Sequence, residues 1–204
     1  MTYQIGPQIS HHQKQVLYGT VLGGSSIIQP KRGRNCYLAM RDRDFDWLAY
    51  KTTELRPFFK MDDSVIKQDK TTHRCYSVAY PIFNEIHEEF YEGGRKIVRK
   101  KVLDLLTDVA WMVWFIDAGR KSKRKAYLRT QKFGEEGSEV IAQYFNELDC
   151  DCKVHTTRGR YEIIFSNRGA CEYLRTMLHR APRFILDRMD EANPGHMTNF
   201  RQGQ

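Results

Sequence analysis

Val16–Ser25 (VLYGTVLGGS) is an apolar, helix-like run that ends in small residues and leads into a strand-forming stretch. Ala110–Gly119 (AWMVWFIDAG) is a second run of the same kind. Ala118 follows Gly24 by 94 residues (118 − 24), which is nearly half of the 204-residue chain. A duplicated unit of this size predicts a pseudo-two-fold molecule, and that symmetry suits duplex DNA.

The hydrophobic periodicity predicts an α+β fold in which the order αββαββα occurs twice, with two antiparallel sheets flanking a central helix pair. Gly19 and Gly23 would share one face of the first helix and admit another helix closely, which accounts for two residues that each cost a helix about 1 kcal/mol. In the first half, helices are expected at 13–23, 45–55 and 81–91, and hairpins at 26–41 and 64–79. In the second half, strands are expected at 121–131, helices at 135–148 and 171–179, and a hairpin at 153–166.

The repeats define the expected domains. Residues 8–92 form the N-terminal repeat, 93–101 a linker with Gly93-Gly94 as a hinge, and 102–190 the C-terminal repeat. Residues 191–204 are polar, contain Gly and Pro, and are expected to form a flexible tail.

The chain is basic, with 33 Lys and Arg against 25 Asp and Glu, a net charge of +8 and a pI near 9.3. Such a charge favours a polyanionic partner, and it leaves nucleic acid and an acidic membrane surface both open. No apolar run is long enough to span a bilayer, and the N-terminus lacks signal-peptide features, so we expect an intracellular protein. The five cysteines have no metal-site spacing, which favours reduced thiols.

Basic residues gather on the expected strands and their turns. Along 125–131, Lys125, Tyr127, Arg129 and Gln131 alternate with Ala126, Leu128 and Thr130, so that one face can bind DNA while the other packs on helices. A solvated, charged sheet face is the alternative. The expected DNA-contacting residues are Gln29, Lys31, Arg32, Arg34, Tyr37, Arg41, Lys67, Lys70, Arg74, Lys121, Lys123, Lys125, Tyr127, Arg129, Gln131, Lys153, His155, Arg158 and Arg160.

With these features the chain resembles the LAGLIDADG homing endonucleases in their single-chain, two-motif form, over about residues 13–180. The resemblance rests on Leu17–Ser25 and Trp114–Gly119, with the Gly94-Arg95-Lys96 linker and Leu106-Thr107 in support. It implies that the two motif helices pack together at the pseudo-dyad. It also implies that an acidic residue near the end of each helix binds Mg²⁺ for double-strand DNA cleavage at an intron or intein target.

This chain departs from the family pattern at both acid positions, where Gly24 and Ala118 stand and neither side chain can bind a metal. Ser25 replaces the usual following glycine. Asp117 matches the preceding, more structural position, and is either a metal ligand or a helix-end carboxylate. We therefore expect Mg²⁺ binding to be impaired and little or no strand cleavage, whether the acids were lost naturally or replaced deliberately.

The expected function is site-specific binding of a duplex site of about 20 bp by a monomer, because both motifs lie in one chain. An RNA-binding intron maturase and a non-cleaving DNA-binding regulator are the alternatives, and neither needs the acids. Other clusters are interpreted as structural. Asp42, Asp44, Asp62 and Asp63 are expected to be charge partners, His11 and His12 surface residues, and Trp111, Trp114 and Phe115 core residues.

Overall fold

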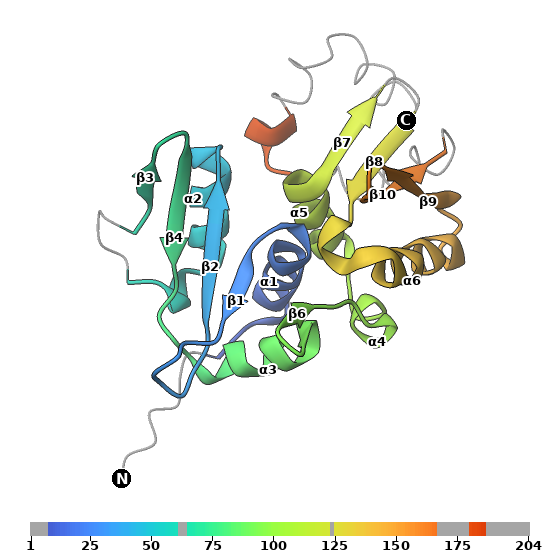
Figure 1. Cartoon of the computed structure of the whole chain (residues 1–204). Helices are drawn as coiled ribbons and strands as arrows, with labels where there is room; N and C mark the ends of the chain where they lie inside the picture. The colour runs from blue at the N-terminus through green and yellow to red at the C-terminus, as the bar shows by residue number, and fades with distance from the viewer. Residues whose placement is uncertain (1–7, 61–64, 123–124, 167–179, 187–204) are drawn as a thin grey trace. The chain divides into compact units, whose positions relative to one another are not determined.

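The computed structural model describes residues 8–60, 65–122, 125–166 and 180–186 (Figure 1). The helix expected at 171–179 and the tail expected at 191–204 lie outside these ranges. The chain divides into two compact units, Met1–Asp117 and Ala118–Gln204. None of the helices in the described ranges is long and apolar enough to cross a membrane.

The first unit begins with the first motif helix, α1 (His11–Gly23). Ser10 caps its N-terminus in a capping box with Gln13, which pairs backbone donors that a helix start leaves unsatisfied. The helix ends at Gly24, whose N–H donates to the carbonyl of Thr20. Its residues from Gln15 to Gly23 are all buried, so this helix is a core element.

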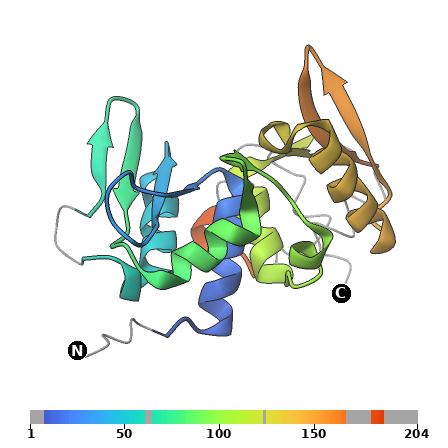
Figure 2. The same cartoon turned by 60° about the horizontal axis from the view of Figure 1, so that its bottom comes forward.

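The first sheet has the strand order β1-β2-β4-β3 and confirms both expected hairpins of this half. Its strands are β1 (Ser26–Ile28), β2 (Tyr37–Asp42), β3 (Lys67–Asp69) and β4 (Thr72–Tyr76). The helix α2 (Phe45–Glu54) packs on one face of β2 and β4, as Figures 1 and 2 show, and a 3₁₀ turn (Arg56–Phe58) follows it. Leu38 and Met40 of β2 are buried on that face, so the opposite face of this strand is left outward.

The helix α3 (Pro81–Phe90) opens with proline, as expected, because the first helical position needs no N–H donor. Gly93 and Gly94, expected to form a hinge in the linker, lie in the turn of a short hairpin. Tyr91–Glu92 (β5) and Arg95–Lys96 (β6) pair as a two-stranded hairpin, closed by Gly93 and Gly94 with φ of 54° and 75°. Positive φ at both central residues is the turn that matches the twist of paired strands, so the two glycines close a hairpin at the linker.

Two further helices complete the first unit, α4 (Lys100–Leu103) and the second motif helix, α5 (Asp108–Ala118). The helices α1 and α5 approach closely at the glycines identified in the sequence. A Cβ on Gly19 would collide with the carbonyl of Ala110 and the side chain of Val113, and a Cβ on Gly23 would collide with Asp117. The predicted packing of the two motif helices is thus confirmed.

The second unit repeats the strand order of the first, with β7-β8-β10-β9 (Figure 1). Its strands are β7 (Gly119–Ser122), β8 (Lys125–Arg129), β9 (Cys152–Thr157) and β10 (Arg160–Phe165). A 3₁₀ turn (Gln131–Phe133) leads into α6 (Gly134–Glu147), which packs on β9 and β10 (Figure 2). The predicted α+β class and the duplicated arrangement of elements are confirmed. The repeat boundaries at 92 and 102 stay a prediction, because they divide the chain by repeat and not by packing.

Candidate nucleic-acid interface

The outward face of the first sheet is set by strand register. Arg41 lies opposite Arg74, which in turn lies opposite Lys67 on β3. Ala39 lies opposite Tyr76 in the same way. Directly opposed residues of an antiparallel pair share a face, so these side chains project together on the side away from α2. The exposed fractions agree, since 61% of the Arg41 side chain and 45% of the Arg74 side chain are exposed.

Arg41 is held in place by two neighbours on this face. Its Nη2 donates to Asp69 at 3.0 Å and its Nε donates to the Thr72 hydroxyl at 2.7 Å. Asp69 also lies 3.8 Å from Nη1 of Arg74. A single carboxylate therefore contacts both arginines of this face, Arg41 and Arg74.

Tyr37 and Tyr76 form an edge-to-face pair on the same surface, with ring centroids 6.1 Å apart. With Ser77 and Ala79 they line a hollow of about 390 Å³. Tyr76 was not among the residues predicted from the sequence, although it is 53% exposed. Its alternation with Arg74 along β4 is the signal that could have found it.

The remaining predicted residues of the first half lie at the ends of this sheet. Lys67 is exposed on β3, and Lys70 is exposed in the β3–β4 turn with φ of 55°. The predicted residues of the β1–β2 connection are exposed: Gln29, Lys31, Arg32 and Arg34. The structure thus groups the first-half residues on one sheet face and its connecting loops.

The second sheet presents a similar face. Register places Arg129 opposite Glu162 and Tyr127 opposite Ile164, while Ala126 and Leu128 are buried on the other side. The strand β10 continues the outward face with Arg160. Residues of β9 opposite this face of β10 add two more predicted side chains, Lys153 and His155. Arg158 lies in the β9–β10 turn and is exposed, with φ of 51°.

Arg120 is the residue of this face that sequence reasoning did not select. Its guanidinium carbon lies 3.6 Å from the centroid of the Tyr127 ring, and its Nη2 lies 3.2 Å from both oxygens of Glu162. Glu162 also lies 3.4 Å from Nδ1 of His155. As on the first sheet, one carboxylate anchors two basic residues.

Three predicted residues of the second half are placed differently from the rest. Lys121 lies opposite Ala126 and therefore projects toward the inner side of the sheet. Gln131 lies beyond the end of β8, in the 3₁₀ turn, where its Oε1 accepts a hydrogen bond from the backbone N–H of Tyr161 at 2.9 Å. Lys123 lies outside the described residues. The regular alternation used in the sequence thus ends before Gln131.

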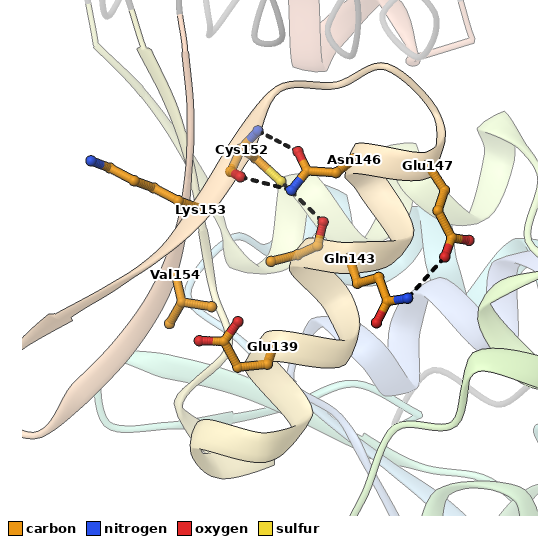
Figure 3. A pocket seen from close by; sticks show the side chains of 8 residues that line it. Glu139, Gln143, Asn146, Glu147, Cys152, Lys153 and Val154 are labelled. Atoms are coloured by element: carbon orange, nitrogen blue, oxygen red, sulfur yellow. Dashed lines mark hydrogen bonds between the residues drawn. The ribbon is translucent and has the colours of Figure 1, made fainter.

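A separate groove of about 690 Å³ runs between α6 and the edge strand β9 (Figure 3). Asn146 bridges its walls, because its amide accepts from the N–H of Cys152 at 2.8 Å and donates to the carbonyl of Cys152 at 3.0 Å. Its rim carries Glu139 and Glu147 on the helix side. The Asn146 amide thus satisfies backbone hydrogen-bonding groups of an edge strand. The groove is polar and not basic.

The ends of the motif helices hold the two acid positions of the resemblance. Gly24 is exposed, and a Cβ built on it would meet no atom within 4 Å. Ala118 is buried, with its carbonyl accepting a hydrogen bond from Nε of Arg129 at 3.2 Å. Lys96 donates to the carbonyls of Val21 and Ser25 at 2.9 and 2.5 Å, and burial lowers the pKa of Lys96 to about 8.

Asp117 is engaged by the neighbouring helix α2. Its Oδ1 accepts from Nζ of Lys51 at 2.7 Å and from Nε1 of Trp47 at 2.5 Å. Only 1% of the Lys51 side chain and 5% of the Asp117 side chain are exposed. Asp42 lies 3.6 Å from the same ammonium group. This buried network favours the helix-end alternative for Asp117 over the metal-ligand one.

The residues at the motif ends do not fit the metal that the resemblance implies. Mg²⁺ needs oxygen ligands, and glycine and alanine supply none from their side chains. The nearest carboxylate, Asp117, already has Lys51 as its counter-ion. Across the described residues, no group of three His, Cys, Asp or Glu side chains could hold a metal ion.

The remaining sequence candidates have structural surroundings. His12 hydrogen-bonds Glu54 at 2.8 Å, and Asp44 caps the N-terminus of α2. Trp114 and Phe115 are buried core residues, as predicted, whereas Trp111 is only half-buried. Asp62 and Asp63 lie outside the described residues. The described cysteines are free and buried: Cys36, Cys75, Cys150 and Cys152.

Comparison with known proteins finds curated relatives by sequence and solved structures of the same fold. The cytochrome b mRNA maturase bI2 of Debaryomyces hansenii is 25% identical over 158 residues, which are 70% of this chain and 59% of that protein. The chain spans between 31% and 59% of the length of the curated relatives it matches.

The fold is shared with solved homing endonucleases. I-WcaI bound to its DNA recognition sequence has a TM-score of 0.74 at 19% identity, over 84% of this chain and 82% of that one. I-DmoI in complex with DNA and Mn has a TM-score of 0.57 at 13% identity, over 82% and 97%. I-DmoI has also been solved with DNA and Ca, so that protein binds divalent metals. A family model matches residues 14–170, more than half of the chain, and the protein belongs to the LAGLIDADG DNA endonuclease family.

Proposed function

We propose that this chain binds a long, specific site on duplex DNA through the outward faces of its two sheets. The observation that carries the proposal is the duplication of one surface. Sheets of identical strand order each expose arginine, lysine and tyrosine side chains on the face away from the packed helix. Arginine and lysine neutralise phosphates, and arginine also reads guanine in the major groove. I-WcaI, whose fold this chain shares, was solved on its DNA recognition sequence.

The salt dependence of binding tests this proposal directly. Each phosphate neutralised by the protein adds about 0.9 to the slope of log affinity against log salt concentration. A selection from a randomised duplex library supplies the site, and the slope is then measured between about 50 and 200 mM salt. A steep slope on the selected duplex is expected, whereas a slope near zero would contradict DNA binding.

We further propose that the chain does not cleave DNA as it stands, because Gly24 and Ala118 occupy both acid positions. Gly24→Asp/Ala118→Asp restores the two carboxylates, and the space around Gly24 admits the first of them. The restored variant is expected to cut the selected duplex with Mg²⁺, while the unmodified chain leaves it intact. Cleavage by the unmodified chain would show that another group, with Asp117 the first candidate, holds the metal.

The second candidate function is an intron maturase that binds RNA. The maturase relative from Debaryomyces hansenii favours it, and it needs neither acid. Competition separates the two candidates. The protein is first bound to labelled selected duplex, and structured intron RNA and unlabelled duplex are then compared as competitors. The maturase is supported if the RNA displaces the label at a lower concentration than the unlabelled duplex does. DNA binding is supported if the unlabelled duplex displaces it at the lower concentration. A DNA-binding regulator is the third candidate, and it is favoured if the Gly24→Asp/Ala118→Asp variant binds the duplex without cutting it.

We propose an intracellular location and a monomeric state. An intracellular location is supported by the free thiols of the described cysteines and by the proposed nucleic-acid target. A monomer is supported by the presence of both sheets in one chain. Light scattering on the purified chain, free and bound to duplex, tests the oligomeric state.

A further inference from the structure

We propose that Asp69 and Glu162 determine sequence specificity, each by holding one arginine of its sheet in the orientation that reads a base. The inference rests on the proposed DNA binding. Each carboxylate adds negative charge to a face that would meet phosphates, which by itself opposes DNA binding. Their contact with basic side chains on these faces, Asp69 from the end of the edge strand β3 and Glu162 from the inner strand β10, therefore needs a reason.

On the first sheet, Asp69 and Thr72 fix Arg41 from two sides. The carboxylate accepts a hydrogen bond from Nη2 at 3.0 Å, and the Thr72 hydroxyl accepts one from Nε at 2.7 Å. Thr72 is itself fixed, since its hydroxyl donates to the backbone carbonyl of Asp69 at 3.1 Å. Guanidinium has five N–H donors, so the donors on Nη1 and one on Nη2 are left for a further acceptor.

On the second sheet, Glu162 and Tyr127 fix Arg120 with a different pair of contacts. Both carboxylate oxygens lie 3.2 Å from Nη2, and the guanidinium carbon lies over the Tyr127 ring, 3.6 Å from its centroid. Arginine stacks on aromatic faces in this way while its edge remains able to donate. Two unrelated sets of contacts thus produce the same result, one immobilised arginine on each sheet.

Immobilisation favours base reading over phosphate binding for two reasons. A bidentate contact to guanine O6 and N7 requires a fixed guanidinium plane, and a side chain already held in that plane loses less conformational freedom on binding. The adjacent carboxylate is also repelled by phosphates, which disfavours moving the arginine toward the backbone. Lys67 and Lys125 lie on the same faces and, among the described residues, have no ion-pair partner, which suits them to phosphates.

The experiment is a selection of bound sequences from a randomised duplex library, made with the unmodified chain and with variants of each sheet. Asp69→Asn removes the charge with nearly unchanged shape, and Thr72→Val removes the second contact to Arg41 without changing the charge. Arg41→Ala identifies the base pair that the arginine reads. Glu85→Gln, at an exposed position of α3, is the control for a lost negative charge.

We expect Asp69→Asn and Thr72→Val to relax preference at the same base pair that Arg41→Ala relaxes, with discrimination there reduced about fivefold or more. Asp69→Asn should also tighten binding to an unselected duplex and raise its salt slope by up to about 0.9, because Arg41 becomes available to a phosphate. Glu162→Gln and Arg120→Ala should relax a second base pair in the same way, with Glu139→Gln on α6 as the control.

Two results would overturn the inference. If Asp69→Asn and Glu162→Gln select the same sequence as their controls, the carboxylates have no role in specificity even though DNA binding stands. If they relax every position equally, they act on overall affinity alone. Selection of no sequence by the unmodified chain would instead contradict the proposed function and the inference together. Thermal unfolding of each variant confirms that it is folded before its selection is read.

Discussion

Nζ of Lys51 lies 2.7 Å from Oδ1 of Asp117, and both side chains are almost completely buried. The pair joins α2 to the end of the second motif helix, one residue before Ala118. Trp47 donates to the same carboxylate oxygen, so the charge of Asp117 is compensated and hydrogen-bonded. A buried charge with its partner removed is strongly destabilising, which makes this contact testable.

Lys51→Met should lower the free energy of unfolding by about 3–5 kcal/mol, because it removes the ammonium group that pairs with the buried Asp117 carboxylate. Lys51→Met/Asp117→Asn should recover part of that loss, since it also removes the buried Asp117 charge and leaves only the more exposed Asp42 without its lysine partner. Urea unfolding of the unmodified chain and the two variants measures both losses, and Asp117→Asn alone completes the cycle that gives the coupling energy. Equal losses in the single and double variants would show that the ion pair does not hold these helices.

Gly19→Ala should destabilise the first unit by about 1–3 kcal/mol, because the new methyl group would meet the backbone carbonyl of Ala110, which cannot rotate away. Gly24→Ala is the matched control at the end of the same helix, where the added methyl group meets open space. Unfolding midpoints in urea compare the two variants. A Gly19→Ala protein as stable as Gly24→Ala would contradict the close helix approach.

Asn146→Ala should lower the stability of the second unit by about 1–2 kcal/mol, because it leaves both backbone groups of Cys152 without their side-chain partner. Gln143→Ala removes an amide one helical turn earlier whose hydrogen-bond partner among the described residues is the exposed carboxylate of Glu147 (Figure 3). It should therefore change stability little. Thermal unfolding followed by circular dichroism measures both. An equal effect of the two substitutions would argue against a role for Asn146 at the strand edge.

Lys96 should make stability depend on pH above neutrality. Burial lowers the pKa of Lys96 from 10.5 to about 8 in the folded chain. Between these values the unfolded chain keeps a proton that the folded chain has released, so stability should rise with pH across this window. The rise is on the order of 1–3 kcal/mol. The Lys96→Met variant should lack this rise in stability. The difference in free energy of unfolding between the two proteins, measured from pH 7.5 to 10.5, separates the contribution of Lys96 from other titrations. If the free energy of unfolding had the same pH profile in both proteins, Lys96 would not be the source of the pH dependence.

Much of the fold was predictable because it follows from local patterns. Gly19 and Gly23 predicted a close helix contact, since two glycines on one helix face have a cost that only packing offsets. Alternation in Lys125, Ala126 and Tyr127 predicted which strand face is outward. The absence of metal-binding acids at Gly24 and Ala118 followed from chemistry that side chains without oxygen cannot perform.

The sequence by itself therefore determined the duplicated order of helices and strands, the basic strand faces and the missing acids, because each depends on residues close together along the chain or on side-chain chemistry alone. Tertiary structure alone decided which distant residues meet. It placed Lys51 against Asp117 and Glu162 against Arg120, and it turned Lys121 inward through the register of β7 on β8. These pairings depend on strand register and helix packing, where a shift of one residue reverses the face on which a side chain lies, and no local pattern records that choice.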